Sequence, residues 1–321
     1  MKPKEILVFG GSGQIGRHLL RKLTRKNFRV TVVTRNIHRK GYVLKSSGNA
    51  GWIDIIELET FNYNKLSQIF KNKDICINLI GILNEKNKSS FNNMHTFLPK
   101  TLALLSKEHN LKQFIHLSAL GVDNANKSKY ALSKLNGENE IKNIFDKYVI
   151  LKPSLVYSVD DNFSTMLMSM LKLMPFFPIY YHGKTIFYPI HVTDMCEIIE
   201  NIIINETKKE TIECIGPEKI SFKELILKIL KSLEIYRPLL PMPLTIAKFV
   251  ATFFEIFMKN PLLTKDQLIL LNYNNEPSGK YKTNIDLKLN SKLKYFENEI
   301  LKYSYMWKNE GEFSKQNNKI N

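Results

Sequence analysis

The chain has 321 residues, enough for one large or two smaller domains with a substantial core. With 44% hydrophobic and 24% charged residues, the composition is that of a globular protein and excludes a disordered chain, a collagen-like repeat and a small disulfide scaffold. Lysine and arginine total 47 against 30 acidic residues, and the resulting net charge of +17 favours anionic partners, although lysines spread among asparagines along the whole chain also fit a nucleotide-biased genome.

The first half alternates short β-branched runs with longer segments of helical character, which is the pattern of strands and crossover helices in a parallel sheet. The predicted strands are 5–10, 29–34, 52–57, 74–80, 113–117 and 148–151. The predicted helices between them are 14–25, 63–70, 94–108 and 129–145. Six strands with intervening helices predict an α/β fold with a Rossmann-type, doubly wound parallel sheet.

The regularity loosens after Pro153, and residues 174–190 form a proline-broken, aromatic stretch that we interpret as an irregular segment on the substrate side. A helix at 191–205 and a strand at 211–215 are then expected to return to the sheet. Beyond Gly216-Pro217 the sequence is mainly helical.

A capping box, Ser221 with Glu224, marks the start of the first helix of this later part. We therefore place a domain boundary near residue 216. Residues 1–215 are predicted to form a Rossmann-type domain. Residues 216–321 are predicted to form a smaller, mainly helical domain for a substrate or partner.

The most apolar part of the chain is residues 238–258, which carry only Lys248 and Glu255 as charges. One interpretation is a helix that lies on a membrane or a partner protein. The other is a helix buried in the smaller domain, which the lack of a strongly cationic polar face favours slightly. The sequence leaves both open.

A glycine-rich turn follows the first predicted strand directly and opens the first helix. Residues without a Cβ allow backbone N–H groups and the positive end of a helix to approach a pyrophosphate closely. The spacing G-x-x-G-x-x-G between a strand and a helix therefore predicts a dinucleotide site. The residues of this turn are Gly10, Gly11, Ser12, Gly13, Gln14, Ile15 and Gly16.

The end of the second strand bears on the choice of dinucleotide. An acidic residue there normally accepts the 2′-hydroxyl of the adenosine ribose, whereas this strand ends in Thr34-Arg35. Because an arginine pairs with a 2′-phosphate that an aspartate would repel, we expect NADP(H) to be favoured over NAD(H). Arg39 and Lys40 add positive charge nearby, although either alone is also typical of solvated surface.

Three further residues are candidates for chemistry. Tyr130 and Lys134, at i and i+4, share one face of a predicted helix. A lysine ammonium there lowers the pKa of the phenol and holds the nicotinamide ribose, so that Tyr130 acts as general acid or base. Ser118 ends the fifth strand, where such sheets bind ligands, and is the candidate to hold a substrate oxygen.

Taken in this order, these motifs resemble the extended and atypical short-chain dehydrogenase/reductases over about residues 4–215. Two more segments carry the resemblance, Asn78-Leu79-Ile80-Gly81 after the fourth strand and Lys152-Pro153-Ser154-Leu155-Val156-Tyr157 after the sixth. The resemblance implies the same doubly wound fold. It also implies that Asn78, Ile80, Gly81 and Pro153 contribute to the cofactor site together with Tyr130 and Lys134.

A narrower resemblance spans nearly the whole chain. The segments 116–122, 260–268 and 303–313 are similar to the nucleotide-binding accessory-subunit family of respiratory complex I. In that family NADPH is bound tightly with a structural role, mitochondrial members depart from the catalytic pattern, and some members are linked to ubiquinone synthesis. This chain keeps Ser118, Tyr130 and Lys134, so the resemblance leaves a catalytic role open.

Two functions from different classes therefore stand side by side. The first is an NADP(H)-dependent reductase or dehydrogenase of an apolar or quinone-related substrate, with Tyr130 transferring the proton. The second is a non-catalytic NADPH-binding accessory or assembly factor of respiratory complex I or of ubiquinone biosynthesis, with complex I as a candidate partner and peripheral contact to the inner membrane. No nucleic-acid motif accompanies the positive charge, so we expect no nucleic-acid partner.

The cysteines Cys76, Cys196 and Cys214 lie far apart, with no second cysteine or histidine at the spacing of metal ligands. The sequence thus predicts neither a disulfide nor a metal site. The N-terminus enters a strand at Glu5 without a signal-peptide pattern, and no uncharged apolar stretch reaches 18 residues. We expect a cytoplasmic protein.

Overall fold

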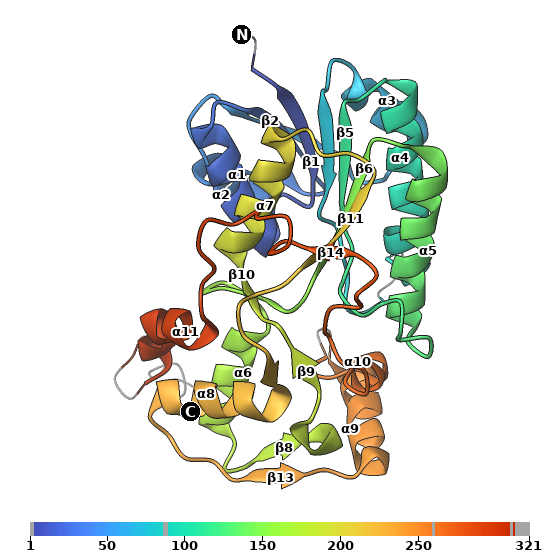
Figure 1. Ribbon diagram of the computed structural model, residues 1–321. Coiled ribbons are helices and arrows are strands. Elements are labelled where there is room, and N and C mark those ends of the chain that lie inside the picture. Colours follow the sequence, from blue (N-terminus) through green and yellow to red (C-terminus); the bar gives the residue numbers. More distant parts are fainter. Residues whose placement is uncertain (1–2, 86–88, 259–260, 309–310, 312–321) are drawn as a thin grey trace. The chain divides into compact units, whose positions relative to one another are not determined.

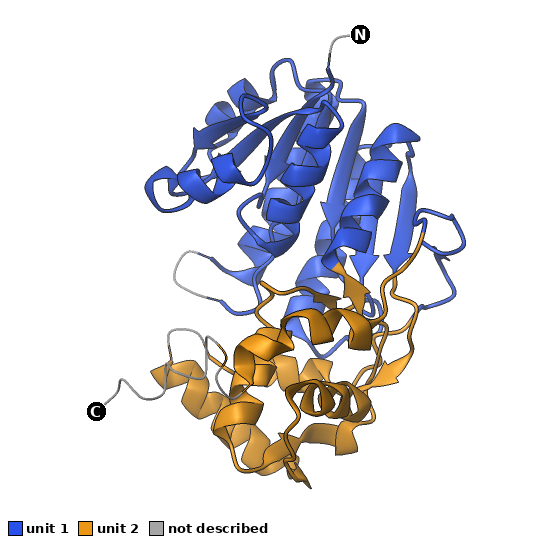
Figure 2. Ribbon diagram, turned by 90° about the vertical axis from the view of Figure 1, so that its left-hand side faces the viewer, with its two compact units in different colours: residues 1–153, 192–214, 277–291 blue, residues 154–191, 215–276, 292–321 orange. Residues whose placement is uncertain are grey.

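The computed structural model describes residues 3–85, 89–258, 261–308 and 311. The chain divides into two compact units that are interleaved in sequence (Figure 2). The sequence predicts a single boundary near residue 216, whereas the chain passes between the units after residues 153, 191, 214, 276 and 291. Unit 1 holds residues 1–153, 192–214 and 277–291, and unit 2 holds residues 154–191, 215–276 and 292–321.

Unit 1 is built on an eight-stranded parallel sheet with the order β14-β11-β6-β5-β4-β1-β2-β3, which confirms the predicted fold class (Figure 1). Every strand predicted from the β-branched runs is present within a few residues of its expected bounds, and a two-residue strand is added at one edge. The strands are β1 Glu5–Phe9, β2 Arg29–Thr34, β3 Ile53–Glu57, β4 Ile75–Asn78, β5 Gln113–Leu117, β6 Tyr148–Pro153, β11 Glu210–Cys214 and β14 Lys282–Thr283.

Helices cover both faces of this sheet, as its doubly wound order requires (Figure 1). On one face α3, α4 and α5 pack their apolar stripes against Leu7, Phe9 and Phe114 of the strands, while α1 and α7 lie on the other. The helices are α1 Gln14–Arg25, α2 Ile37–Ser46, α3 Tyr63–Phe70, α4 Leu98–Glu108, α5 Lys129–Ile144 and α7 Val192–Ile204. The sequence reading did not predict the helix α2.

The helix predicted at 94–108 begins differently from expectation, because a π-helix, Asn92–Phe97, precedes α4. Pro99 has no N–H, so the α-helical hydrogen bond to the carbonyl of His95 cannot form. The wider turn also lets that carbonyl approach α5 at Gly137, where a Cβ would lie 1.9 Å from the oxygen. The π-helix is therefore fixed by two residues far apart in sequence.

Unit 2 has its own core, in which Tyr157, Phe177, Phe222 and Phe296 are buried together. The predicted capping box at the start of α8 is confirmed, with the Ser221 hydroxyl and the Glu224 carboxylate each accepting from the other's backbone N–H. The helices are α6 Ser164–Leu173, α8 Phe222–Leu233, α9 Leu244–Phe257, α10 Lys265–Leu270 and α11 Phe296–Ser304, with 3-10 turns η2 Tyr180–Gly183 and η3 Tyr305–Trp307. Short strands pair two by two: β7 Val156–Tyr157 with β10 Ile190–His191, β9 Ile186–Phe187 with β12 Ile220–Ser221, and β8 Phe177–Ile179 with β13 Leu239–Pro241.

The helix α9 corresponds to most of the apolar stretch 238–258, and it buries small residues while it exposes large apolar ones. Its small residues Ala247 and Ala251 are buried against Tyr180 and Leu268, whereas most of its large apolar side chains are exposed. We call this outward face the α9 apolar face; its members are Ile246, Phe249, Phe253, Ile256 and Phe257. The structure thus decides against the expectation of a fully buried helix. Within the described residues, no helix is long and apolar enough to span a membrane.

Candidate functional site

The glycine turn between β1 and α1 is packed against backbone on two sides. Gly10 has a φ of +80°, and a Cβ there would lie 2.9 Å from the backbone carbon of Leu79 in the loop after β4. A Cβ on Gly16 would lie 2.4 Å from the carbonyl oxygen of Gly11. Because backbone cannot move aside as a side chain can, these two positions require glycine. The turn, the start of α1 and the loop after β4 therefore lie in close approach.

In the part of the chain that the structure describes, no N-cap side chain accepts from the N-terminus of α1. Its N-cap is Gly13, which has no side chain to accept from the first N–H groups, and no acidic residue occupies the first turn. The Gly13 N–H donates to the carbonyl of Gly10 at 3.0 Å, which closes the turn itself. The positive end of α1 is thus available to an anionic group, as dinucleotide sites require.

Four cations gather beside this turn, and we call Arg17, Arg35, Arg39 and Lys40 the basic rim. Arg17 Nη1 donates to the carbonyl of Ser12 at 2.9 Å, and Lys40 Nζ donates to the Ser12 hydroxyl at 3.0 Å. Partial burial, followed by the charges of the three arginines, lowers the pKa of Lys40. Burial is the larger cause of this shift, and the repulsion among the four cations adds to it; such a concentration of positive charge favours an anion.

The loop after β4 is shaped from within by Asn78. The buried Asn78 amide accepts from the N–H of Ile80 at 3.1 Å through its oxygen and donates to Nδ1 of His116 at 3.1 Å through its nitrogen. The remaining ring nitrogen of His116, Nε2, is buried and has no hydrogen-bond partner in the part of the chain that the structure describes. Asn78 therefore holds the loop in shape from inside. The backbone from Ile80 to Gly81 is the part of the loop that is left to line the candidate site.

Lys134 lies beneath that loop. Its Nζ donates to the carbonyl of Leu117 at 2.8 Å and would lie 3.5 Å from a Cβ placed on Gly81. Burial lowers the pKa of Lys134 to about 8, although the charge of Glu138 opposes the shift. Tyr130, one turn earlier on α5, shares the face of Lys134. The structure thus places the predicted pair, Tyr130 and Lys134, next to the loop at Gly81.

The ring of Tyr130 is held by two other rings. Its centroid lies 5.2 Å from that of His95 and 5.9 Å from that of Phe91, both in edge-to-face geometry. Both partners come from the π-helix and the residue before it. The orientation of Tyr130 therefore depends on the irregular turn that precedes α4.

Ser118 is placed differently from its predicted use. Its hydroxyl donates at 2.5 Å to Glu138, a carboxylate with no exposed surface, and Ser118 itself is 4% exposed. The same carboxylate pairs at 3.3 Å with the buried Lys152, which also pairs with Asp123 and stacks over the ring of Tyr281. Burial alone would lower the pKa of Lys152, but Glu138 and Asp123 raise it above its ordinary value. In this arrangement the serine hydroxyl is part of a buried ionic network.

The other residues of the predicted site have backbone roles. Gln14 and Ile15 form the first positions of α1, and the Ile15 carbonyl faces the thiol of Cys196. Pro153 ends β6 and accepts from the N–H of Leu120 at 2.9 Å, which anchors the loop after β5.

The sequence reading missed Arg17, His95 and Glu138. Arg17 follows the third glycine directly, so its place next to the turn was readable from the motif. Glu138 lies four residues after Lys134, on the same helical face. For His95 no sequence signal stands out, since its position depends on the π-helix.

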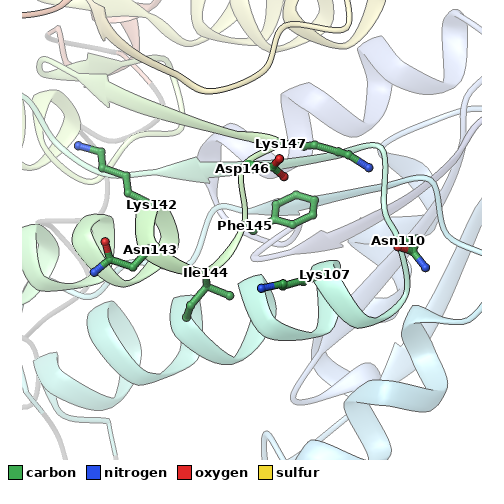
Figure 3. A pocket seen from close by; sticks show the side chains of 8 residues that line it. All are labelled: Lys107, Asn110, Lys142, Asn143, Ile144, Phe145, Asp146 and Lys147. Atoms are coloured by element: carbon green, nitrogen blue, oxygen red, sulfur yellow. The ribbon is translucent and has the colours of Figure 1, made fainter.

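A surface cavity of about 300 Å³ also occurs in unit 1 (Figure 3). It lies where α4 and α5 end and β5 and β6 begin. This is the amino end of the parallel strands, whereas the glycine turn lies at their carboxyl end. Phe145 is the buried residue of its lining, and the rest are partly or fully exposed. The candidate site is therefore the carboxyl end of the strands, where the glycine turn lies, and not this cavity. The cavity is lined by Lys107, Asn110, Lys142, Asn143, Ile144, Phe145, Asp146 and Lys147.

Comparison with curated proteins finds relatives among complex I subunits. The chain is 24% identical over 263 residues to the mitochondrial NADH-ubiquinone oxidoreductase 40 kDa subunit of Neurospora crassa, covering 81% of this chain and 68% of that protein. It is 25% identical over 266 residues to the mitochondrial NADH dehydrogenase [ubiquinone] 1 alpha subcomplex subunit 9 of Mus musculus, covering 81% and 70%. The predicted resemblance to this family is confirmed at this level.

Among solved structures, the fold is similar to dTDP-glucose 4,6-dehydratase DesIV from Streptomyces venezuelae with NAD bound. The TM-score is 0.67 at 14% identity, and the match covers 94% of this chain and 96% of the other. The family model for NAD dependent epimerases and dehydratases matches residues 6–214, which include the glycine turn, Tyr130 and Lys134. This chain therefore belongs to the NAD dependent epimerase/dehydratase family.

Proposed function

We propose that this protein binds NADP(H) in preference to NAD(H), with the basic rim around the 2′-phosphate. The observation that carries the proposal is the gathering of four cations from the start of α1, the end of β2 and the first turn of α2, where Lys40 already has a lowered pKa. A family site that favours a free 2′-hydroxyl has an acidic residue in this region, whereas this chain has Arg35. A dianionic phosphate would relieve the repulsion among these cations.

The test is a fluorescence titration of the purified protein with NADPH and NADH. We expect tighter binding of NADPH, and we expect Arg35→Ala to weaken NADPH by about tenfold or more while leaving NADH unchanged. The matched control is Arg29→Ala at the opposite end of β2, where the guanidinium pairs with Asp54. Equal affinity for the two nucleotides in the wild type would refute the preference.

We further propose that the bound cofactor is used in reduction. A nicotinamide cofactor supplies hydride. On this chain, Tyr130 would move the proton at the substrate oxygen, and Lys134 would hold the ribose and favour the phenolate. Support comes from the shared face of Tyr130 and Lys134 and from the contact of Lys134 with the loop at Gly81. The names of the relatives make a quinone the first substrate to try.

The aromatic stretch 174–190 does not strengthen the case for an apolar substrate, because Phe177, Ile179 and Tyr180 are buried in unit 2. The substrate therefore has to be tested directly, by adding a short-chain quinone to the NADPH-bound protein. Oxidation of NADPH that Tyr130→Phe abolishes supports the reductase. The matched control is Tyr63→Phe, a tyrosine on α3 whose hydroxyl donates to Glu108.

The second candidate is a non-catalytic accessory subunit of respiratory complex I. It is favoured by the relatives, which are subunits of that complex, and by Ser118, whose hydroxyl is engaged with Glu138. For this role we expect tight NADPH binding, no oxidation with any quinone, and full tolerance of Tyr130→Phe in complex I assembly. Loss of assembly in the phenylalanine variant would count against it.

For either role we propose peripheral contact with the inner membrane through the α9 apolar face, on a protein that is otherwise cytoplasmic. Phe249 is 76% exposed and Ile256 is 70% exposed on this face. Aromatic and aliphatic side chains of an exposed helix enter the headgroup boundary, and the net charge of +17 favours anionic lipid. Sedimentation with anionic vesicles at low and high salt tests the proposal, and no salt-sensitive binding would refute it.

A further inference from the structure

One buried imidazole connects the two parts of the proposed site. The N–H of Ile82, in the loop after β4, donates to Nε2 of His95 at 3.0 Å. Nδ1 of the same ring lies 2.9 Å from the hydroxyl of Ser133 on α5. That hydroxyl donates to the carbonyl of Tyr130 at 2.7 Å, and the ring edge faces the ring of Tyr130. His95 itself has no exposed surface.

These partners fix the protonation state of His95. A backbone N–H only donates, so Nε2 must be the unprotonated nitrogen that accepts from Ile82. The proton of the neutral ring then lies on Nδ1, and this N–H donates a hydrogen bond to the Ser133 hydroxyl, which in turn donates a hydrogen bond to the Tyr130 carbonyl. Burial, followed by the charge of Lys134, lowers the pKa of His95 to about 3, so the ring stays neutral under physiological conditions.

The segment that His95 anchors lies between the glycine turn and Lys134. A Cβ on Gly10 would touch the backbone of Leu79, and a Cβ on Gly81 would lie 3.5 Å from Lys134 Nζ. Ile82 follows directly. An anchor at Ile82 therefore sets how this loop approaches the two groups that are proposed to hold the pyrophosphate and the ribose.

We infer that His95 is a positioning residue of the proposed cofactor site, which in its Nδ1-protonated form ties the loop 79–82 to the turn of α5 that carries Tyr130. The inference rests on the proposed binding of NADP(H). His95 touches neither cofactor nor substrate; it acts through Ile82 and Ser133. Nε2 accepts from Ile82 in the loop after β4, and Nδ1 donates to Ser133 on α5.

Two half-isosteres separate these duties. His95→Asn keeps a donor near the position of Nδ1 and loses the acceptor for Ile82, whereas His95→Gln reaches the position of Nε2 with its amide oxygen and loses the donor to Ser133. We expect His95→Asn to speed amide exchange at Ile82 by about tenfold and to weaken NADPH by about five- to tenfold. His95→Gln should keep Ile82 protected and NADPH affinity within about twofold.

Melting temperatures of both variants supply the control for general damage. If NADPH affinity follows the melting temperature in both variants, or if the two variants weaken NADPH equally, the inference is overturned and His95 is only a packing residue. Exchange at Ile82 is measured without nucleotide. A wild type that binds neither nucleotide therefore refutes the proposed function, while equal Ile82 exchange in the two variants refutes the anchor itself.

A measurement on the unaltered protein does not depend on the folding of any variant. Nitrogen-15 spectra of histidine-labelled wild type should show His95 neutral, with its proton on Nδ1, between about pH 5 and 8. A ring protonated on Nε2, or a charged ring in this range, would overturn the inference whatever the variants do.

Discussion

Two regions of the molecule depart from the usual placement of polar and apolar residues, in opposite ways. On α5 and at the neighbouring strands β5 and β6 of unit 1, four polar residues are each at most 4% exposed: Ser118, Lys134, Glu138 and Lys152. On α9 in unit 2, phenylalanine and isoleucine side chains face outward while alanines are buried. A buried charge and an exposed apolar patch are both informative, because ordinary folding energetics favour neither.

The two departures indicate different causes. The buried polar groups are partnered with one another and with backbone, so they are stabilised within the unit and fix the shape of the candidate site. Among the described residues, the contacts of α9 with Tyr180 and Leu268 involve its small residues and not the α9 apolar face. The first region is satisfied by the chain itself, and the second is the surface on which the proposed membrane contact depends.

The largest effect is expected where the buried region is tightest. Gly137→Ala places a methyl group 1.9 Å from the carbonyl oxygen of His95, and the atoms that it would meet, in His95 and Thr96, all belong to the backbone. We expect the substitution to destabilise the protein by more than about 3 kcal/mol, measured by urea unfolding. The matched control is Gly41→Ala in α2, whose new methyl would meet only the movable side chain of Ile37 and should change stability by less than about 1 kcal/mol. A folded Gly137→Ala protein of normal stability would show that α5 does not lie against the π-helix.

The next effect concerns the ionic network. Lys152→Met leaves the carboxylates of Glu138 and Asp123 without their buried cation, and we expect a loss of about 3 kcal/mol. Adding Glu138→Gln should restore part of that loss, which a double-mutant cycle measures. The control is Lys219→Met, which breaks an exposed pair with Glu276 and should leave stability unchanged. Strict additivity of the first two changes would mean that Lys152 and Glu138 do not interact.

These residues also show how far the sequence carried the reading. The parallel strands, the glycine turn and the pair Tyr130 and Lys134 were predictable, because each is encoded by local spacing or by one helical period. The engagement of Ser118 with Glu138 was not, since a serine at the end of a strand can turn toward the ligand or toward the neighbouring helix. In the structure the hydroxyl turns toward Glu138 of the helix, a carboxylate that also pairs with the buried Lys152.

The π-helix and the division into units lie still further from local signals. An apolar period fits an α-helix and a π-helix almost equally well, and the deciding contact joins His95 to Gly137 across more than forty residues. The edge strand β14 has only two residues, and it returns the chain to unit 1 after a long passage through unit 2. Such long-range pairings carry no periodicity of their own.

A third prediction concerns the charge of Lys134. In the folded protein its pKa is lowered to about 8 by burial, whereas the unfolded chain keeps the proton up to about 10.5. Between these values the unfolded state binds more protons, so the stability of the wild type rises with pH relative to Lys134→Met. The full difference is about 3 kcal/mol, and urea unfolding of both proteins at pH 7 and pH 10 measures it. Lys107→Met, an exposed lysine on α4, is the control for general alkaline effects, and an unchanged difference between wild type and Lys134→Met would contradict the buried ammonium.

The smallest effect on stability is expected on α9. A small effect there would show that the α9 apolar face does not contribute to folding. Phe249→Ser with Phe253→Ser removes two exposed rings, so the free energy of unfolding should change by less than about 0.5 kcal/mol per site. Ala251→Leu, on the buried side of the same helix, should cost about 1–3 kcal/mol through overpacking. If the serine variant lost as much stability as the leucine variant, the α9 apolar face would be covered within the chain and its proposed contact with a membrane would fail. If stability stays unchanged while sedimentation with anionic vesicles is lost, the exposed rings contribute to binding outside the chain and not to its folding.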